Sequence, residues 1–301
     1  MLFPTSKITI QKLSDDLFDQ KKLTVSVLRL DQLHEIVSGN KLFKLYYLLP
    51  IAQQQSQEGI ITFGGPYSNH LVATAYACKE IGLKSIGIVR GEQPAVLSHT
   101  LQACLAHGME LKFITRQQYD KKDQPEFLES INWAYPKFLS IPEGGYHPLG
   151  AEGASLIMNW ITNDTTHICC AVGTATTLAG ILKGLKKEQQ LIGFPVIKNM
   201  SDIEQRLASL LPIPYNTQQL QIMDEYHFGG YAKKTQELID AMNTLYEKHQ
   251  LPTDFVYTGK MMFGVIDCIS KDFFQKGSNI LCIHTGGLQG NLSLPPGSLK
   301  F

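Results

Sequence analysis

Three polar side chains, those of Ser68, Asn69 and His70, follow an apolar run at 60–63 and two glycines. The run is typical of a buried strand, and a helix is predicted at 71–81. Helix N-termini carry free N–H groups and partial positive charge, so they attract carboxylates and phosphates. Open α/β sheets bind ligands where strands end and helices begin. We expect an enzyme site here; the alternatives are helix capping by Ser68 or Asn69 and a hydrogen-bonded structural role for His70.

A second candidate is Lys41, which follows Gly39 and Asn40. Asn40 is a suitable cap for a helix whose apolar residues recur at helical spacing. A lysine at a helix start is unfavourable, because the helix dipole favours cations at the opposite end. A partly desolvated amine has a lowered pKa and can form a Schiff base. From this segment alone, the alternative of a solvated surface lysine is favoured.

A third segment, at 172–180, follows a predicted strand and opens a helix. Its backbone N–H groups and the hydroxyls of Thr174, Thr176 and Thr177 could surround one phosphate. The Gly-Lys-Ser/Thr ending of a Walker loop and the three spaced glycines of a dinucleotide fingerprint are both missing. A phosphomonoester therefore fits better than a nucleotide, and the alternative is a well-capped strand–helix turn.

Two further segments place hydroxyls beside glycines: Tyr257-Thr258-Gly259-Lys260 and His284-Thr285-Gly286-Gly287. Each alone is better explained as an ordinary turn. Most of the candidate segments share one property, however, because they fall where the carboxyl edge of a sheet would lie.

The elements that must position these residues alternate along the chain. Strands are predicted at 59–63, 85–90, 111–114, 167–172, 191–196, 220–223 and 279–284. Helices are predicted at 71–81, 96–107, 154–160, 178–186, 233–248 and 262–275. This alternation indicates βαβ units, and hence an α/β fold with open, mostly parallel twisted sheets and helices on both faces. The turn-rich loop 143–150 is the best boundary between a small α/β domain, 44–148, and a large domain formed by 1–43 plus 149–301.

Composition excludes several classes of protein. The 301 residues are 44% hydrophobic and 18% charged, with zero formal net charge, which speaks against nucleic-acid and anionic-membrane partners. No apolar run approaches the roughly 20 residues of a membrane span, and the N-terminus lacks an export signal. The six cysteines have no metal-like or disulfide-like spacing. We therefore expect reduced, buried thiols in a cytoplasmic protein without a metal site.

Taken together, the motifs resemble the pyridoxal-phosphate enzymes grouped as 1-aminocyclopropane-1-carboxylate deaminase and D-cysteine desulfhydrase, of the tryptophan-synthase-β-like fold (fold type II). The matching segments occur in the family's order over nearly the whole chain. They are Gly39-Asn40-Lys41 with Lys44-Leu45, Gly64-Gly65 with Ser68-Asn69-His70, the loop from Thr174 to Gly180, Tyr257-Thr258-Gly259-Lys260, and His284-Thr285-Gly286-Gly287.

For the cofactor, the resemblance implies that Lys41 binds pyridoxal phosphate covalently, with Lys44 as the fallback. It implies that Thr258 is the partner of the pyridine nitrogen and that Asn69 also contacts the cofactor. The phosphate cup corresponds to Thr174, Ala175, Thr176 and Thr177. Ala175 replaces a glycine of the deaminases, so the cup is expected to be tighter while its backbone donors survive.

For the substrate, the resemblance implies a small amino acid and a homodimeric enzyme. Ser68 and Tyr257 correspond to residues that assist the chemistry. The substrate-binding residues implied are Ser68, Asn69, His70, Tyr231, Tyr257 and Thr285. Tyr67 stands where a glutamine is common, which could narrow the substrate pocket.

Thr258 and Thr285 bear on the reaction, because the family's cyclopropane deaminases carry glutamate and leucine there and its desulfhydrase-like members carry small hydroxyl residues. A glutamate keeps the pyridine nitrogen protonated, whereas a threonine hydroxyl can donate to an unprotonated nitrogen and makes a weaker electron sink. We therefore expect β-elimination from D-cysteine, with Lys41 removing the α-proton, to give pyruvate, ammonia and sulfide. The alternatives are cyclopropane-acid deamination and a non-catalytic homologue that binds the cofactor.

Overall fold

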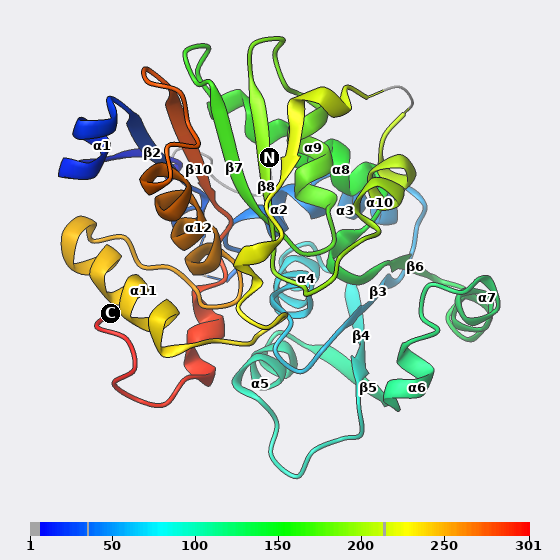
Figure 1. Ribbon diagram of the computed structural model, residues 1–301. Coiled ribbons are helices and arrows are strands. Elements are labelled where there is room, and N and C mark those ends of the chain that lie inside the picture. Colours follow the sequence, from blue (N-terminus) through cyan, green and yellow to red (C-terminus); the bar gives the residue numbers. More distant parts are fainter. Residues whose placement is uncertain (1–6, 35, 213–214) are drawn as a thin grey trace.

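The computed structural model describes residues 7–34, 36–212 and 215–301, and these form two β-sheets flanked by helices (Figure 1). The larger sheet has the order β1-β2-β10-β7-β8-β9. Only the β1–β2 pair is antiparallel; the other neighbours run parallel. Its strands are β1 (Ile10–Leu13), β2 (Thr24–Arg29), β7 (His167–Val172), β8 (Gln190–Pro195), β9 (Leu220–Ile222) and β10 (Asn279–His284).

The smaller sheet has the order β5-β4-β3-β6 and is parallel throughout. Its strands are β3 (Gly59–Gly64), β4 (Lys84–Arg90), β5 (Met109–Ile114) and β6 (Phe138–Ile141). Two mostly parallel sheets with helices on both faces are the fold class that the sequence predicts. All four strands fall inside the predicted unit 44–148, whose boundaries stay a prediction.

Helices cover both faces of the larger sheet. In Figure 1, α12 (Thr258–Ser270) lies in front of it with α11 (Gln236–His249) outside, while the helices near its other face are those drawn in green and blue. These are α2 (Asn40–Leu45), α3 (Leu48–Gln54), α8 (Pro148–Ser155), α9 (Thr176–Lys183) and α10 (Ile203–Leu210). The short α1 (Asp16–Lys21) packs beside α12. None of the helices in the described ranges is long and apolar enough to cross a membrane.

The smaller sheet is covered in the same way. One core cluster joins the sheet to α4 (Asn69–Glu80) and α5 (His99–Ala106). A second cluster, on the opposite side of β3 and β4, joins it to α6 (Arg116–Tyr119) and α7 (Pro125–Ala134). This arrangement leaves the carboxyl end of β3 free to lead directly into α4.

Strand β7 shows why the central strands of these sheets have continuous apolar sequences. Cys169 and Ala171 face the core under α12, while Ile168, Cys170 and Val172 face the core under α9. A central parallel strand is buried on both faces, so neither face can be polar. Each large apolar side chain buried in this way contributes about 1.5–3 kcal/mol. All six cysteines of the chain are buried and unpaired, as predicted.

The predicted helix at 154–160 is misplaced. The α-helix is α8, which begins at Pro148, and 154–160 is mostly the 3-10 turn Leu156–Trp160. Gly150 ends the loop 143–150 that the sequence predicts, but it lies within α8, and both Gly150 and Gly153 allow close packing. A Cβ on Gly153 would lie 1.9 Å from the carbonyl oxygen of Phe43 in α2. The sequence-based prediction does not contain strands β1, β2 and β6 or helices α1, α6, α7 and α10. Of these, β1 and β6 lie at sheet edges, and α1 and α6 are short.

Candidate active site

The candidate residues converge where several strands end. The segment 173–177, which carries Thr174, Thr176 and Thr177 and is called the threonine loop below, follows the carboxyl end of β7. Thr285 follows that of β10, and the Ser68-Asn69-His70 turn follows that of β3. The N-termini of α2 and α12 meet them there. For the segments after β7 and β10 this is what parallel topology predicts, because the carboxyl ends of parallel strands share one edge of a sheet. The turn after β3 comes from the smaller sheet, so packing between distant segments brings it to the same place.

The close approach of the Lys41 helix to the larger sheet depends on Gly39. Gly39 has φ +66°, and a Cβ there would lie 1.9 Å from the carbonyl oxygen of Thr285. The N–H of Asn40 donates to that same carbonyl at 3.2 Å. Only glycine tolerates this combination of backbone conformation and contact. Lys41, the second residue of α2, is thereby placed beside the carboxyl end of β10.

Lys41 is tied to the threonine loop through its neighbour. Its Nζ donates to Asn40 Oδ1 at 2.7 Å, and Asn40 Nδ2 donates to Thr177 Oγ1 at 2.8 Å. The expectation that Asn40 caps the helix is wrong: Gly39 occupies the cap position, and Asn40 is the first helical residue. Its side chain is buried and used to bridge two segments.

The surroundings of Lys41 make its amine chemically competent. Burial lowers its pKa to about 8, and the negative charge of Asp254 opposes that shift only in part. The Nζ lies 6.0 Å from the centre of the Tyr257 ring. A solvated surface lysine would have none of these contacts, so that alternative is wrong. An amine with a pKa near 8 has an accessible neutral form that can attack a carbonyl group or accept a proton.

Lys44, the fallback lysine, lies one turn further along the same helix and is 4% exposed. Burial, and then the charge of Lys41, hold the pKa of Lys44 well below its ordinary value. A Cβ on Gly145 would lie 3.1 Å from the Lys44 Cβ and 3.7 Å from His70 Cε1. Lys44 therefore packs against the loop 143–145, with His70 nearby, whereas Lys41 has the hydrogen bond that leads to the threonine loop.

The threonine loop has the form of an anion cradle. Ala175 takes the left-handed conformation (φ 66°, ψ −2°) directly before α9. Thr174 Oγ1 and Thr176 Oγ1 lie 2.9 Å apart, and Thr176 and Thr177 are buried in the first turn of the helix. The first backbone N–H groups of a helix have no intrahelical acceptor and bind anions. The Tyr257 ring closes one side, since a Cβ on Gly173 would lie 3.2 Å from it.

The turn after β3 contributes unsatisfied acceptors. Ser68 Oγ accepts the N–H of Leu71 at 3.4 Å, so this hydroxyl caps α4 as the structural alternative predicts. The Oδ1 atom of Asn69 is buried without a hydrogen-bond partner. A Cβ on Gly287 would lie 3.3 Å from Asn69 Nδ2, which places Asn69 at the wall formed by β10.

His70 is buried and neutral. Thr62 Oγ1 donates to the carbonyl of Ile141 at 2.7 Å, so it must accept from His70 Nε2 at 3.0 Å. The Nδ1 atom of His70 is buried without a partner. Burial, together with the charges of Lys41 and Lys44, lowers the His70 pKa to about 3. The ring therefore offers an acceptor, and it would not donate to a carboxylate through Nδ1.

The two tyrosines named from the sequence are neighbours in the structure. Tyr257 donates to the hydroxyl of Tyr231 at 3.3 Å, and their ring centres are 6.0 Å apart. The loop that carries Tyr231 is held by Lys260, whose Nζ donates to the carbonyls of His227 and Gly230 at 2.9 and 2.8 Å. Lys260 is fully buried, and these two hydrogen bonds anchor that loop.

Thr258 is buried at the start of α12, and its hydroxyl donates to Asp254 Oδ1 at 2.7 Å. From the sequence, the Thr258 hydroxyl is expected to donate its proton to a pyridine nitrogen. In the structure that proton is donated to Asp254 instead. Sequence reasoning missed Asp254 altogether. The signal was available, because an aspartate shortly before a helix is a capping residue.

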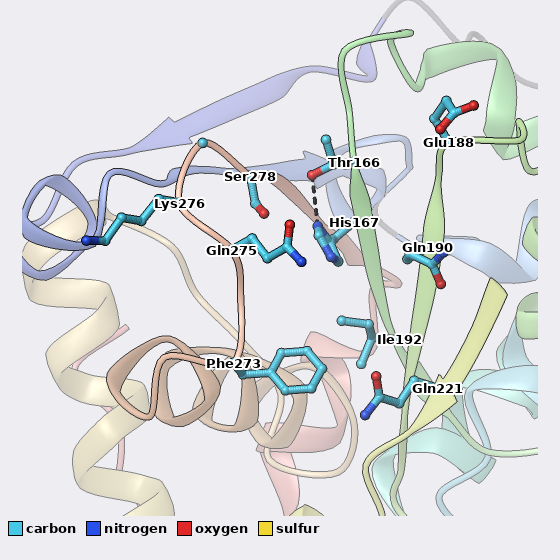
Figure 2. A pocket seen from close by; sticks show the side chains of 11 residues that line it. Thr166, His167, Glu188, Gln190, Ile192, Gln221, Phe273, Gln275, Lys276 and Ser278 are labelled. Atoms are coloured by element: carbon cyan, nitrogen blue, oxygen red, sulfur yellow. Dashed lines mark hydrogen bonds between the residues drawn. The ribbon is translucent and has the colours of Figure 1, made fainter. Parts of the chain in front are cut away.

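Tyr67, which was expected to narrow the substrate pocket, is 53% exposed and lies against His99 of α5, with ring centres 5.7 Å apart. It therefore lies on the outer side of the turn. A separate hollow of about 540 Å³ lies at the amino ends of β7 and β8, lined by His167, Gln190 and the loop before β10 (Figure 2). That hollow is at the opposite edge of the sheet from Lys41 and holds none of the candidate residues.

The fold is that of an α/β protein, and it places a helix with two lysines beside a loop of the kind that binds anions, where parallel strands end. A family model described as pyridoxal-phosphate dependent enzyme matches residues 3–286. The chain belongs to this family.

Relatives support the narrower resemblance. A Thermotoga maritima protein named "putative 1-aminocyclopropane-1-carboxylate deaminase" is 32% identical over 86% of this chain and 88% of its own length. A D-cysteine desulfhydrase of Klebsiella pneumoniae is 29% identical over 94% and 92%. The crystal structure of an ACC deaminase homologue matches with a TM-score of 0.81 at 27% identity, covering 97% of this chain and 92% of that one. O-Ureido-L-serine synthase, 13% identical with a TM-score of 0.67, shares the fold.

The residues present fit pyridoxal phosphate. Two buried polar side chains, Asn69 and His70, have one atom each (Oδ1 and Nδ1) without a partner within the described part of the chain, so they retain hydrogen-bonding capacity for a ligand. The first turn of α9 offers backbone N–H groups and buried hydroxyls to a phosphate. Lys41 offers an amine of lowered pKa, connected to that loop through Asn40.

Proposed function

We propose that this chain is a pyridoxal-phosphate-dependent lyase that eliminates the β-substituent of a small amino acid, with D-cysteine as the leading substrate. The products are pyruvate, ammonia and sulfide. The observation that carries the proposal is the Lys41 amine, which has a pKa of about 8 and is linked to the threonine loop by two hydrogen bonds.

The cofactor, when bound, supplies the electron sink that stabilises negative charge at the substrate's α-carbon. The first turn of α9, with Thr174, Thr176 and Thr177, would hold its phosphate. Lys41 would attach to its aldehyde, and Asn69 would contact the ring. The assignment of Lys41 rather than Lys44 is supported by the Asn40 bridge.

The chain's own groups then suit removal of an α-proton. The free Lys41 amine, whose pKa burial lowers to about 8, would accept that proton, because a base with a pKa near neutral suits proton transfer. The turn 68–70 would hold the substrate carboxylate and so fix which face of the α-carbon meets Lys41. In this arrangement Ser68 and backbone N–H groups are the donors, because His70 Nδ1 is an acceptor. Tyr257 and Tyr231 would lie beside the leaving group, and Thr285 beside the substrate.

Deamination of a cyclopropane amino acid is the second candidate. It is favoured by the names of relatives such as the Thermotoga protein. Its substrate has no α-proton, so a lysine base alone cannot start the reaction. The D-cysteine desulfhydrase relative, aligned over 94% of this chain, supports the first candidate. We also propose that the protein is a homodimer and that it is cytoplasmic.

The test compares substrates on one preparation. Purified protein loaded with pyridoxal phosphate is incubated separately with D-cysteine, L-cysteine and 1-aminocyclopropane-1-carboxylate, while sulfide, pyruvate and 2-oxobutanoate are measured. Sulfide and pyruvate from D-cysteine, absent in Lys41→Ala, support the proposal. Production of 2-oxobutanoate alone favours the deaminase. Loaded protein that releases no product from any substrate contradicts an enzymatic role with these amino acids.

A further inference from the structure

Asp254 is a fully buried carboxylate with four hydrogen-bond donors around it. Its Oδ2 accepts the N–H groups of Val256 and Tyr257 at 3.0 and 2.8 Å. Its Oδ1 accepts both the N–H and the hydroxyl of Thr258, at 2.9 and 2.7 Å. A buried carboxylate needs such donors, because an unpaired charge is costly to bury. Both oxygens are thus fixed in place, and the carboxylate can only accept.

These contacts fix how the hydroxyl of Thr258 can hydrogen-bond. A hydroxyl has one proton and two lone pairs. The proton is held by Asp254 Oδ1, and one lone pair accepts the N–H of Asp254 at 2.9 Å. One lone pair remains. Any group that meets this oxygen from the site must therefore be a donor.

Asp254 belongs to the wall of the site. Gly287 has φ +100°, and a Cβ there would lie 3.2 Å from Asp254 Cγ and 3.3 Å from Asn69 Nδ2. The space beside Gly287 is thus bordered by the Asp254 carboxylate and by Asn69, which belongs to the turn after β3. Burial lowers the pKa of Lys41 and Lys260 and raises that of Tyr257; the charge of Asp254 opposes the first two shifts and adds to the third, so it acts on the titratable groups of the site.

We propose that Asp254 is a positioning residue that fixes Thr258 as a hydrogen-bond acceptor, so that the ring nitrogen of bound pyridoxal phosphate is held protonated. This inference depends on the proposed placement of that nitrogen beside Thr258. An unprotonated nitrogen would set its lone pair against the lone pair of the hydroxyl oxygen, whereas a pyridinium N–H satisfies it. The buried negative charge behind the hydroxyl stabilises the same protonated form.

The consequence is a stronger electron sink than a neutral threonine alone suggests. A protonated pyridine ring withdraws electrons from the substrate's α-carbon more effectively than an unprotonated one. The Asp254 carboxylate would then act on the ring indirectly. It binds the Thr258 hydroxyl, and the hydroxyl contacts the ring.

The test reads the nitrogen directly. Protein without cofactor is reconstituted with pyridoxal phosphate carrying ¹⁵N in the ring, and the ¹⁵N chemical shift is recorded at neutral pH. A pyridinium shift is expected for the wild type and for Thr258→Ser, which keeps the hydroxyl. A free-pyridine shift in the wild type overturns the inference.

Asp254→Asn is the decisive variant. Its carbonyl oxygen can accept the N–H groups of Val256 and Tyr257, and its NH₂ group can then donate to the Thr258 hydroxyl, whose proton is released toward the ring. The backbone N–H of Thr258 loses its acceptor in this arrangement, so the variant is also expected to be less stable. The expected shift is that of a hydrogen-bonded, unprotonated pyridine. A pyridinium shift in folded Asp254→Asn contradicts the role of Asp254; if this variant does not fold, the comparison of wild type with Thr258→Val decides, with loss of the pyridinium shift expected in Thr258→Val.

The visible absorbance of the lysine-bound cofactor separates the two proposals. If the wild type gains no such absorbance, the proposed function fails. If the absorbance forms and the wild-type nitrogen is unprotonated, only the role of Asp254 fails.

Discussion

The side-chain amide of Asn40 donates to the hydroxyl of Thr177 at 2.8 Å, joining two residues that are 137 positions apart in the sequence. The same side chain accepts from Lys41 at 2.7 Å. The lysine and the anion cradle are thus parts of one hydrogen-bonded unit. Asn40 and Lys41 are neighbours in the sequence, and Thr177 is brought to them by the packing of α2 against α9.

Asn40→Ala should weaken both folding and cofactor binding. Removing the amide leaves the buried Thr177 hydroxyl and the Lys41 amine without this partner, at a cost of about 1–3 kcal/mol. Urea unfolding measures the loss, and a titration with pyridoxal phosphate measures binding. Gln54→Ala, which removes an exposed amide on α3, is the control and should change neither. Unaltered stability and binding in Asn40→Ala would show that the bridge is unimportant.

Lys41→Ala should abolish the visible absorbance of the bound cofactor and lower kcat/KM by at least about 10²-fold, because base and attachment point are lost together. Lys44→Met is the matched variant, since it removes the other buried amine of the same helix and retains an unbranched apolar side chain. It should keep the absorbance. If Lys44→Met loses the absorbance and Lys41→Ala keeps it, Lys44 is the residue that binds the cofactor.

Ala175→Gly should stabilise the protein by about 1 kcal/mol, because a left-handed conformation is strained for alanine and unstrained for glycine. The melting temperature reports this change. Ala103→Gly in the interior of α5 should have the opposite sign, since glycine destabilises a helix by a similar amount. If both substitutions lower the melting temperature, Ala175 is not strained.

His70 should make the protein sensitive to acid. Its pKa is about 3 in the folded state and 6.5 in an ordinary environment. Between pH 6.5 and 3 the unfolded chain binds a proton that the folded chain does not, so stability falls as the pH decreases through this window. The free energy of unfolding at pH 7.5 and 4.5 measures the slope. His70→Gln should show a shallower decline, and an equally steep decline in that variant would assign the acid sensitivity to other groups.

Lys260→Met should loosen the loop that carries Tyr231. The carbonyls of His227 and Gly230 would lose their charged donor, at a cost of about 1–3 kcal/mol in stability. Lys233 and Lys234 are exposed on this loop, so limited digestion with trypsin should cut there faster in the variant. Lys260→Arg keeps the positive charge and should be closer to the wild type. Equal cutting rates in wild type and Lys260→Met would mean that the anchor does not hold the loop.

Much of the site was predictable because each segment has its own local chemistry. Glycines beside hydroxyls, a lysine after an asparagine, and threonines at a helix start are visible in the sequence. The central strands were predictable as well, since burial on both faces requires continuous apolar runs. The order of these segments was enough to identify the family before any contact was known.

Other features depended on contacts between distant segments. Asn40 looked like a helix cap and is a bridge to Thr177; Lys41 looked like a surface lysine and is a desolvated amine. Gly150 looked like a loop residue and lies in α8, where its lack of a side chain allows close packing. In each case the local pattern was compatible with two roles, and only the neighbouring element decided between them.

The sequence by itself determined which chemical groups are available and in which order the α/β units carry them. The tertiary structure decided what those groups can do, because pKa values and hydrogen-bond direction depend on burial and on neighbours. The Thr258 hydroxyl is the clearest case. Its sequence position cannot tell whether it donates or accepts toward a ligand, and the buried carboxylate of Asp254, which takes its proton, decides that it accepts.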